Sequence, residues 1–316
     1  MDFCQVFSNR AHPPSVLPVM KGLIPTSISL PRLRDPRWAQ IAVLGSLLTY
    51  GTANFSFAPS IGVIALTLGT AFLVQAVCSR WVKIPFDPRS PLITGLSLCL
   101  LLRTSHPGWM VVAAGIAIAS KFCIRSSGKH IFNPANLAIA ALVFLPDVWV
   151  SPGQWGSGPV LVFFFAGLGL LVLSRTARSD VTWAFLIAYA LFLFGRALWL
   201  GDPWSIPLRQ LQNGAVLLFA FFMISDPRTV PDHRIGRIAF AVTVAGLGVG
   251  LNFNVIDPAT NGLFFALTAC CLFVPLMNRW WKAPQFVWSQ TTASKPPSHA
   301  LPIAQPAHPL PKGHLS

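Results

Sequence analysis

One short stretch of the sequence gathers cations, amides and a glycine in a pattern suited to binding an anion or a polar ring. It contains Gly128, Lys129, His130, Asn133 and Asn136. An asparagine followed by proline is typical of a helix start, where the side chain caps free amides and the missing proline N–H costs nothing. The positive end of that helix favours an anionic group. We therefore predict a binding cluster here, although Lys129 and His130 equally fit the positive flank of a membrane span.

A second set of residues repeats this pattern farther along the chain. Asp257–Thr260 resembles Asn133–Asn136 at an offset of 124 residues, and Asn213-Gly214 resembles Thr94-Gly95 at an offset of 119 residues. Interrupted segments at matching positions of two halves point to a binding site at the interface of an inverted repeat. Asn213, Gly214, Asp257 and Thr260 are therefore predicted to form a counterpart cluster on the opposite face. Each motif taken alone is also explained as an efficient helix start.

A third set lies at the end of an apolar run, where Asp226 and Thr229 lie beside Arg228, Arg234 and Arg237 in the sequence. An acidic residue among cations either forms a salt-bridge lattice or marks the point where an ion is taken up. The sequence shows no Ser-His-Asp, paired-carboxylate or phosphate-loop pattern, so no catalytic residue is predicted and the chain alone is not expected to be an enzyme. No Cys-x-x-Cys occurs and the histidines are loosely spaced, so no metal site is predicted.

The elements that position these residues follow from the composition. Hydrophobic residues make up 53% of the 316 residues and charged ones 10%, far below the roughly 25% of a soluble domain. A spanning helix needs about 20 apolar residues. The apolar runs that we expect to be helices are 37–54, 60–78, 91–102, 109–120, 135–146, 157–174, 181–200, 211–225, 237–253 and 260–278.

The distribution of basic residues predicts the orientation of these segments. With ten spans, alternating loops place twenty of the 23 Lys and Arg residues on the side of both termini, and only Arg103, Arg196 and Arg209 on the other. Cytoplasmic loops retain positive charge. We therefore expect a multi-pass protein of the bacterial inner membrane with both termini in the cytoplasm. Because the cations are scattered between apolar runs, no nucleic-acid partner is expected.

These observations predict an all-α polytopic membrane protein with about ten transmembrane helices in two inverted five-helix repeats. Residues 1–35 form a cytoplasmic segment and 36–280 the transmembrane domain, with repeat halves of about 36–148 and 157–280. Residues 281–316 are rich in proline, and we expect a disordered cytoplasmic tail.

Several stretches resemble the RnfD/NqrB family, which comprises one membrane component of the Rnf electron-transport complex and one of the sodium-pumping NADH:quinone reductase. The Lys129–Asn136 stretch (KHIFNPAN) and Phe221–Thr229 (FFMISDPRT) are similar to its signatures. Leu92–Leu96 is similar to its third-helix motif, and Trp149–Pro152 to a loop of some members. The resemblance covers roughly residues 35–280, and it implies ten helices in two inverted halves.

The same resemblance implies a flavin, since the family links flavin mononucleotide (FMN) through phosphate to a threonine in an S-G-A-T-like motif. Here the matching position is Val216, which has no hydroxyl. The departure suggests a divergent, stand-alone branch in which FMN or riboflavin, if bound, is held without a covalent link. The function implied is that of a membrane subunit of a flavin-dependent electron-transport system, working with other electron-transport subunits and coupled to ion translocation. The alternatives are a transporter or channel-like protein that kept the scaffold, or a membrane anchor for a partner enzyme.

Overall fold

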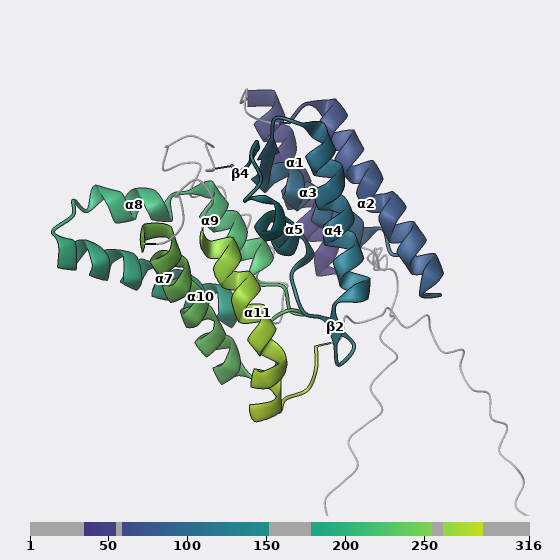
Figure 1. The fold of residues 1–316 in the computed structure, drawn as a ribbon. Coiled ribbons are helices and arrows are strands. Elements are labelled where there is room, and N and C mark those ends of the chain that lie inside the picture. The colour runs from purple at the N-terminus through teal and green to yellow at the C-terminus, as the bar shows by residue number, and fades with distance from the viewer. Residues whose placement is uncertain (1–34, 55–58, 152–177, 255–261, 287–316) are drawn as a thin grey trace, which may run out of the picture. The chain divides into compact units, whose positions relative to one another are not determined.

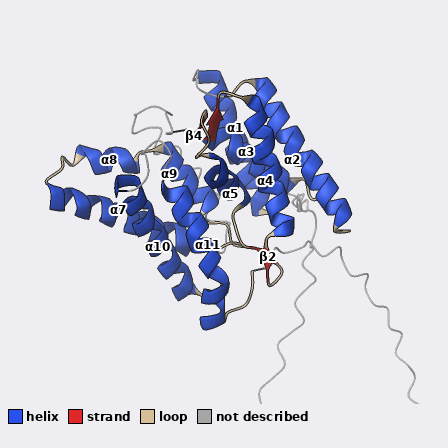
Figure 2. Ribbon diagram, in the orientation of Figure 1, coloured by secondary structure: helices blue, strands red, loops and turns tan. Residues whose placement is uncertain are grey.

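The protein is mostly helical in the computed structural model, which describes residues 35–54, 59–151, 178–254 and 262–286 (Figures 1 and 2). Every apolar run that falls in these ranges contains a helix, although the bounds of several differ from the prediction. The predicted segment 157–174 and most of the segments 1–35 and 281–316 lie outside the described residues.

The first half contains five helices among the described residues. They are α1 (Pro36–Asn54), α2 (Ile61–Trp81), α3 (Arg89–Leu101), α4 (Pro107–Cys123) and α5 (Pro134–Leu142). Local chemistry explains several of their starts. Ser60 caps α2, and proline occupies the first turn of α4 and of α5, where no amide is needed for the helix.

The second half is built from longer helices and one interrupted segment. Its elements are α7 (Ser179–Leu200), α8 (Ser205–Leu211), α9 (Gly214–Leu218), the π-helical turn η2 (Phe219–Met223), α10 (Arg234–Asn254) and α11 (Gly262–Trp280). Helix α7 ends at Leu200, and the capping residue Gly201 has a left-handed φ of 73°, which suits a residue without a Cβ atom.

Length and hydropathy separate the helices into two groups. Helices α2, α7, α10 and α11 are long and apolar enough to cross a membrane. Helices α3, α4 and the combined α9–η2 segment are apolar but shorter than 18 residues. Large apolar side chains on the long helices are exposed, among them Leu73 of α2 and Leu191 of α7, at 65% and 67%. Outward-facing leucines of this kind are expected where lipid is the surrounding solvent.

The helix predicted over 211–225 is found with different bounds, because its helical part runs from Gly214 to Met223. Helix α8 ends at Leu211, Asn213 caps a new helix, and the chain then widens into the π-helical turn. The amide of Ile224 donates to the carbonyl oxygen of Phe219 at 3.0 Å, which is the longer hydrogen-bonded loop of a π-helix. Asn213 explains why a new helix begins here. Its side chain accepts a hydrogen bond from the amide of Ala215, an amide that in an uninterrupted helix would bond to a carbonyl of the preceding turn.

The expectation of an all-α chain is also incomplete, because two short antiparallel strand pairs occur. Strand β1 (Leu102–Thr104) pairs with β4 (Val148–Val150), and β2 (Arg125–Ser126) pairs with β3 (Lys129–His130). Each pair lies directly beside a helix end. The strands pair each other's backbone groups, and the amide of Ser151 after β4 donates to the carbonyl oxygen of Leu101 at the end of α3 at 2.7 Å. Such pairing matters most in an apolar surrounding.

Helix packing follows a similar order in both halves. Helix α2 packs on α4 and α4 on α5, while α7 packs on α10 and α10 on α11. Helices α5 and α11 contact each other and so join the two halves (Figure 1). The cysteines Cys78, Cys99, Cys270 and Cys271 are buried, as expected for small apolar side chains between helices.

Candidate functional site

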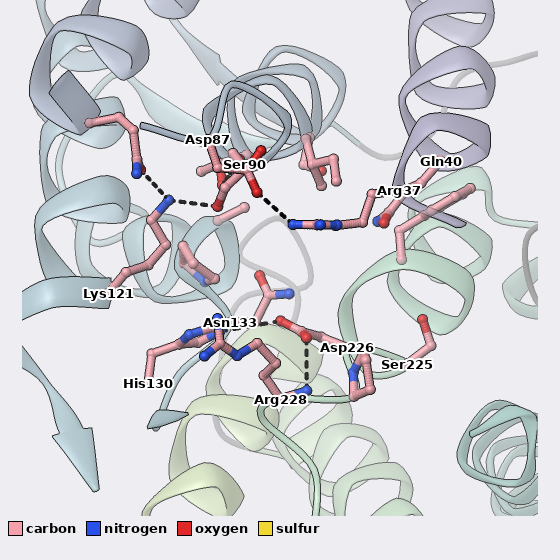
Figure 3. Close-up of a pocket in the computed structure, with 18 of the residues that line it drawn as sticks. Arg37, Gln40, Asp87, Ser90, Lys121, His130, Asn133, Ser225, Asp226 and Arg228 are labelled. Atoms are coloured by element: carbon pink, nitrogen blue, oxygen red, sulfur yellow. Dashed lines mark hydrogen bonds and ion pairs between the residues drawn. The ribbon is translucent and has the colours of Figure 1, made fainter. Parts of the chain in front are cut away.

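A cavity of about 330 Å³ lies where residues of both halves meet. Its volume falls in the lower part of the range of small-molecule sites. It is lined by the starts of α1, α3 and α5, the end of α4, the β2–β3 hairpin and the turn after η2. The polar and charged residues among its lining are Arg37, Gln40, Gln75, Asp87, Ser90, Thr94, Ser97, Lys121, Arg125, His130, Asn133, Ser225, Asp226 and Arg228 (Figure 3).

The starts of α1 and α3 are tied together by four charged residues. Arg37 donates to Asp35 and to Asp87, with N–O distances of 2.7 Å for both ion pairs. Arg89 donates to Asp87 at 2.7 Å and also contacts Asp35. Two arginines and two aspartates therefore neutralise one another. The cluster fixes the two helix ends beside the cavity and adds no net charge to it.

Lys121 has a different surrounding, because its partners are neutral. Its Nζ atom donates to Gln75 Oε1 at 2.7 Å and to Ser90 Oγ at 2.8 Å. These two bonds connect the end of α4 to α2 and to the start of α3 (Figure 3). A lysine ammonium has three donors, so one remains for a further acceptor.

His130 and Asp226 face each other across the cavity floor. Strand β3 carries His130 and the turn after η2 carries Asp226, and 3.5 Å separates Nε2 from Oδ2. The backbone amide of Arg228 donates to Asp226 Oδ1 at 3.0 Å. Burial opposes ionisation, but His130 and Arg228 hold the pKa of Asp226 below its ordinary value. The carboxylate is therefore charged at neutral pH.

The start of α5 brings two asparagines into the interior. Asn133 Oδ1 accepts from the Asn136 amide at 3.1 Å, which is the predicted cap, and Asn133 also lines the cavity. Asn136 points away from the cavity toward α11. Its Nδ2 atom donates to Phe264 O at 3.0 Å and to Thr268 Oγ1 at 2.8 Å. Asn133 thus lies at the site, whereas Asn136 holds α5 against α11.

Lys129 belongs to a separate buried ion cluster. Its Nζ lies 2.6 Å from Asp232 Oδ1, and Arg178 Nη2 lies 2.9 Å from the same oxygen. Arg178 also donates to the carbonyls of Pro227 and Pro231, both at 3.1 Å. Although burial raises it, the pKa of Asp232 is lowered overall by Lys129 and Arg178. This cluster connects the hairpin to the turn that carries Asp226.

The remaining predicted site residues lie apart from the cavity or outside the described ranges. Thr229 is 1% exposed and donates to the backbone oxygen of Asp226 at 3.2 Å, so it shapes the turn. Asn213 caps α9 through a 2.9 Å bond from Ala215 N, and Gly214 is buried beside it. Gly128 has a φ of 82° and forms the hairpin turn. Asp257 and Thr260 lie outside the described residues.

Arg234 and Arg237 do not surround Asp226, although their nearness in sequence suggested that they would. Arg237 pairs with Asp180 at 2.6 Å, and Arg234 lies 3.9 Å from the same residue. Asp180 begins α7, far from Asp226 in sequence. The salt-bridge lattice considered for this region therefore forms around Asp180, and Asp226 is left facing His130.

Sequence reasoning missed most of the cavity's cations. Arg37, Lys121 and Arg125 were interpreted only as positive flanks that set the orientation, and Arg228 also as a cation beside Asp226. The sequence did place all four on the same predicted side of the membrane, at inner helix ends. It does not show which of the twenty basic residues on that side lie close together in the fold.

The described residues hold no group of three or more His, Cys, Asp or Glu side chains that could bind a metal ion. The cavity instead combines amides, cations, two carboxylates and the aromatic residues Phe122, Phe221 and Phe222. Polar edges beside aromatic faces suit an organic ligand with a flat ring and hydrogen-bonding atoms.

Comparison with known proteins points to one family. Residues 147–286 match the model of the NQR2, RnfD, RnfE family. The D component of an ion-translocating oxidoreductase complex from Halorhodospira halophila is 26% identical, over 70% of this chain and 83% of the relative. The matching component from Cronobacter sakazakii is 29% identical, over 83% of each chain. The D component of a Na⁺-translocating ferredoxin:NAD⁺ oxidoreductase complex from Acetobacterium woodii is 24% identical, over 77% of this chain and 88% of the relative.

Proposed function

We propose that this chain, which is related to the NQR2, RnfD, RnfE family, is a membrane-embedded subunit of a flavin-dependent, ion-translocating electron-transport complex. The observation that carries the proposal is the agreement between family and geometry. His130 and Asn133 come from one family-like stretch and Asp226 from another, and all three line one cavity although Asn133 and Asp226 are 93 positions apart in the sequence (226 − 133).

The architecture proposed is ten membrane helices in two inverted halves, within the bacterial inner membrane and with both termini in the cytoplasm. The matching order of packing, α2–α4–α5 and α7–α10–α11, supports the two halves. In this arrangement α5 corresponds to α11 and α3 to α9, and the starts of α5 and α9 are capped by Asn133 and Asn213. Such helix ends are tolerated within a membrane where protein shelters them.

The flavin, FMN or riboflavin, is proposed to bind in the cavity without a covalent link. Val216 is 2% exposed within α9 and offers no oxygen for a phosphoester. The residues present fit a flavin: Asn133 and His130 can bond the polar edge of the ring, and phenylalanines line the same space. A bound flavin would supply the redox chemistry by accepting and passing on electrons. Its donors and acceptors would be other subunits, as the relatives' names imply.

Purification of the full chain in a mild detergent tests this proposal. We expect yellow protein with about one flavin per chain, and release of that flavin on acid precipitation because no covalent bond holds it. Colourless, folded protein that also fails to quench the fluorescence of added flavin would contradict the proposal.

His130→Ala should weaken flavin binding up to about tenfold, because a lost hydrogen bond costs about 0.5–1.5 kcal/mol and tenfold corresponds to about 1.4 kcal/mol. The matched control is His106→Ala. His106 also lies near an aspartate, Asp147, at 3.8 Å, but its side chain is 70% exposed and lines no part of the cavity.

The transporter alternative is favoured by one observation, which is the loss of the hydroxyl at Val216. It predicts solute flux through the isolated chain in liposomes. Flux by flavin-free protein would support a non-redox role on the same scaffold, whereas flavin binding without flux supports electron transport.

A further inference from the structure

The C-terminal ends of two long helices share one short sequence pattern. Residues 80–83 at the end of α2 are Arg-Trp-Val-Lys, and residues 279–282 at the end of α11 are Arg-Trp-Trp-Lys. We call this the Arg-Trp-x-Lys pattern, in which x is a variable residue. Both helices are long and apolar enough to cross a membrane. The pattern therefore occurs twice at the point where a spanning helix would leave the bilayer.

The cations of the two patterns are exposed, and their side chains form no hydrogen bond or ion pair with any residue that the structure describes. They are Arg80, Lys83, Arg279 and Lys282. The tryptophan between each pair is exposed as well, Trp81 at 76% and Trp280 at 67%. The helix dipole favours a cation at a C-terminus, but it gives no reason for a large apolar ring to be exposed beside it. An exposed ring between two unpaired cations suits the boundary between lipid tails and charged headgroups.

The backbone at Lys83 adopts a conformation that usually selects glycine. Its φ is 57°, in the left-handed region. The Lys83 amide donates to Arg80 O at 3.3 Å, and the Ile84 amide donates to Ser79 O at 3.0 Å, which are the two hydrogen bonds of a Schellman helix end. Glycine is the usual residue at this position, so the ending of the helix does not explain the lysine. A role for its charge does.

Both patterns lead into segments beside the β2–β3 hairpin. Ile84 and Pro85, which follow the first pattern, line the cavity together with Arg125 of the hairpin. After the second pattern, Gln285 Nε2 donates to the backbone oxygen of Ser127 in the hairpin turn at 2.9 Å. The two helix ends therefore lie on the same side of the described structure as the hairpin. In the orientation proposed above, this side faces the cytoplasmic leaflet.

We propose that each Arg-Trp-x-Lys pattern is a docking site for an anionic phospholipid. The arginine binds the headgroup phosphate in bidentate fashion and the lysine binds it as a point charge. The tryptophan ring lies at the level of the headgroups, where its amphipathic character is accommodated. An anionic lipid brings a net negative charge that a zwitterionic lipid lacks, so two cations select it. This docking requires only that the chain lies in a membrane, and it is independent of whether a flavin binds.

Mass spectrometry of the intact full-length protein in detergent counts the lipids that remain bound. Wild-type protein titrated with phosphatidylglycerol should retain two lipids per chain, one for each pattern, at concentrations where phosphatidylcholine is not retained. The preference should weaken as the ionic strength rises, because exposed charges are screened. Equal retention of the two lipids would overturn the proposal and favour an acidic segment of another protein as the partner of these cations.

The two sites can be removed separately. Arg80→Gln combined with Lys83→Gln should leave one bound phosphatidylglycerol, and so should Arg279→Gln combined with Lys282→Gln. Binding at the altered site should weaken about twentyfold, because each basic residue near an anionic surface contributes about a factor of five. All four side chains are exposed, so the fold should survive. Retention of two lipids by the variant with all four substitutions would overturn the proposal.

The matched control combines Arg209→Gln with Arg234→Gln. It removes the same charge from two exposed side chains that belong to neither pattern, and it should retain both lipids. Loss of lipid from this control would show that retention follows net charge alone, and the assignment to the two patterns would be wrong.

Thermal unfolding in nanodiscs tests the same sites in a bilayer. Phosphatidylglycerol should raise the unfolding temperature of the wild-type and control proteins above its value in phosphatidylcholine, because a ligand that binds the folded state stabilises it. The variant with all four substitutions should unfold at the same temperature in both lipids. A rise that persists in this variant would show that anionic lipid acts elsewhere and would overturn the proposal.

Discussion

Neighbouring residues of the β2–β3 hairpin have different partners. Lys129 and His130 are adjacent in strand β3, where successive side chains point to opposite faces. Lys129 accordingly reaches Asp232 at 2.6 Å, while His130 faces Asp226 in the cavity. One residue of the pair therefore holds the hairpin in place, and the other takes part in the candidate site.

Asp232→Asn should lower the stability of the protein by about 3–5 kcal/mol. The side chains of Asp232, Lys129 and Arg178 are at most 9% exposed, and removing one partner leaves buried charge without compensation. Thermal unfolding in detergent measures the change. Asp202→Asn, which breaks the 2.7 Å pair with Arg196 whose side chains are about 30% exposed, is the control and should cost less than about 1 kcal/mol.

The same cluster gives stability a dependence on pH. Because folding lowers the pKa of Asp232 and of Asp226, their contribution is present above the unfolded pKa of about 3.9 and is lost as pH falls through the lower folded values. The wild-type protein should therefore lose stability below about pH 4. In the Asp232→Asn variant this loss should be smaller, and an equal loss in both proteins would contradict the ion cluster.

At the scale of elements, the close approach of α10 and α11 depends on glycine. A Cβ atom on Gly248 would collide with the side chain of Leu263 and lie 3.4 Å from its Cα atom. Leu263 is 0% exposed, so any movement of its side chain would disturb other packed residues. Helix α11 also carries Phe264 and Thr268, the partners of Asn136, so this approach determines how α5 is held beside the cavity.

Gly248→Ala should therefore destabilise the protein by about 1–3 kcal/mol, the usual cost of overfilling a packed interface. Gly250→Ala on the same helix is the matched control. A Cβ atom there would meet no atom within 4 Å, so the higher helix propensity of alanine should leave stability equal or slightly raised. Melting temperatures of the two variants decide the comparison, and similar values would show that the helices separate without cost.

At the scale of the whole molecule, the distribution of charge predicts how the chain is inserted. Lys83, in the loop after α2, belongs to the side that holds twenty basic residues, and Arg209 of α8 to the side that holds three. Both side chains are exposed. Their loops should therefore open on opposite faces of the membrane.

Single cysteines at these two positions test the insertion in a background without Cys4 and Cys123. In right-side-out vesicles, a membrane-impermeant maleimide should label Arg209→Cys and leave Lys83→Cys unlabelled until the membrane is permeabilised. Labelling of both from one side would rule out the ten-helix arrangement and its two inverted halves.

The sequence alone determined the features that depend on local chemistry. Hydropathy placed the helices, Asn133 with Pro134 predicted the capped start of α5, and the motifs predicted the family. Hydropathy did not predict the break at Asn213 or the two strand pairs, because a cap or a backbone pairing depends on where other groups lie. The periodicity of a helix carries no information about such partners.

Only the tertiary structure decided which polar residues share the cavity. It brings Lys121, His130 and Arg228 together although they belong to different elements, and it turns Lys129 and Asn136 away to Asp232 and α11. The polarity of each residue and its neighbours in the sequence do not reveal the direction in which its side chain points. The direction follows from the packing of the helices, which is a property of the whole chain.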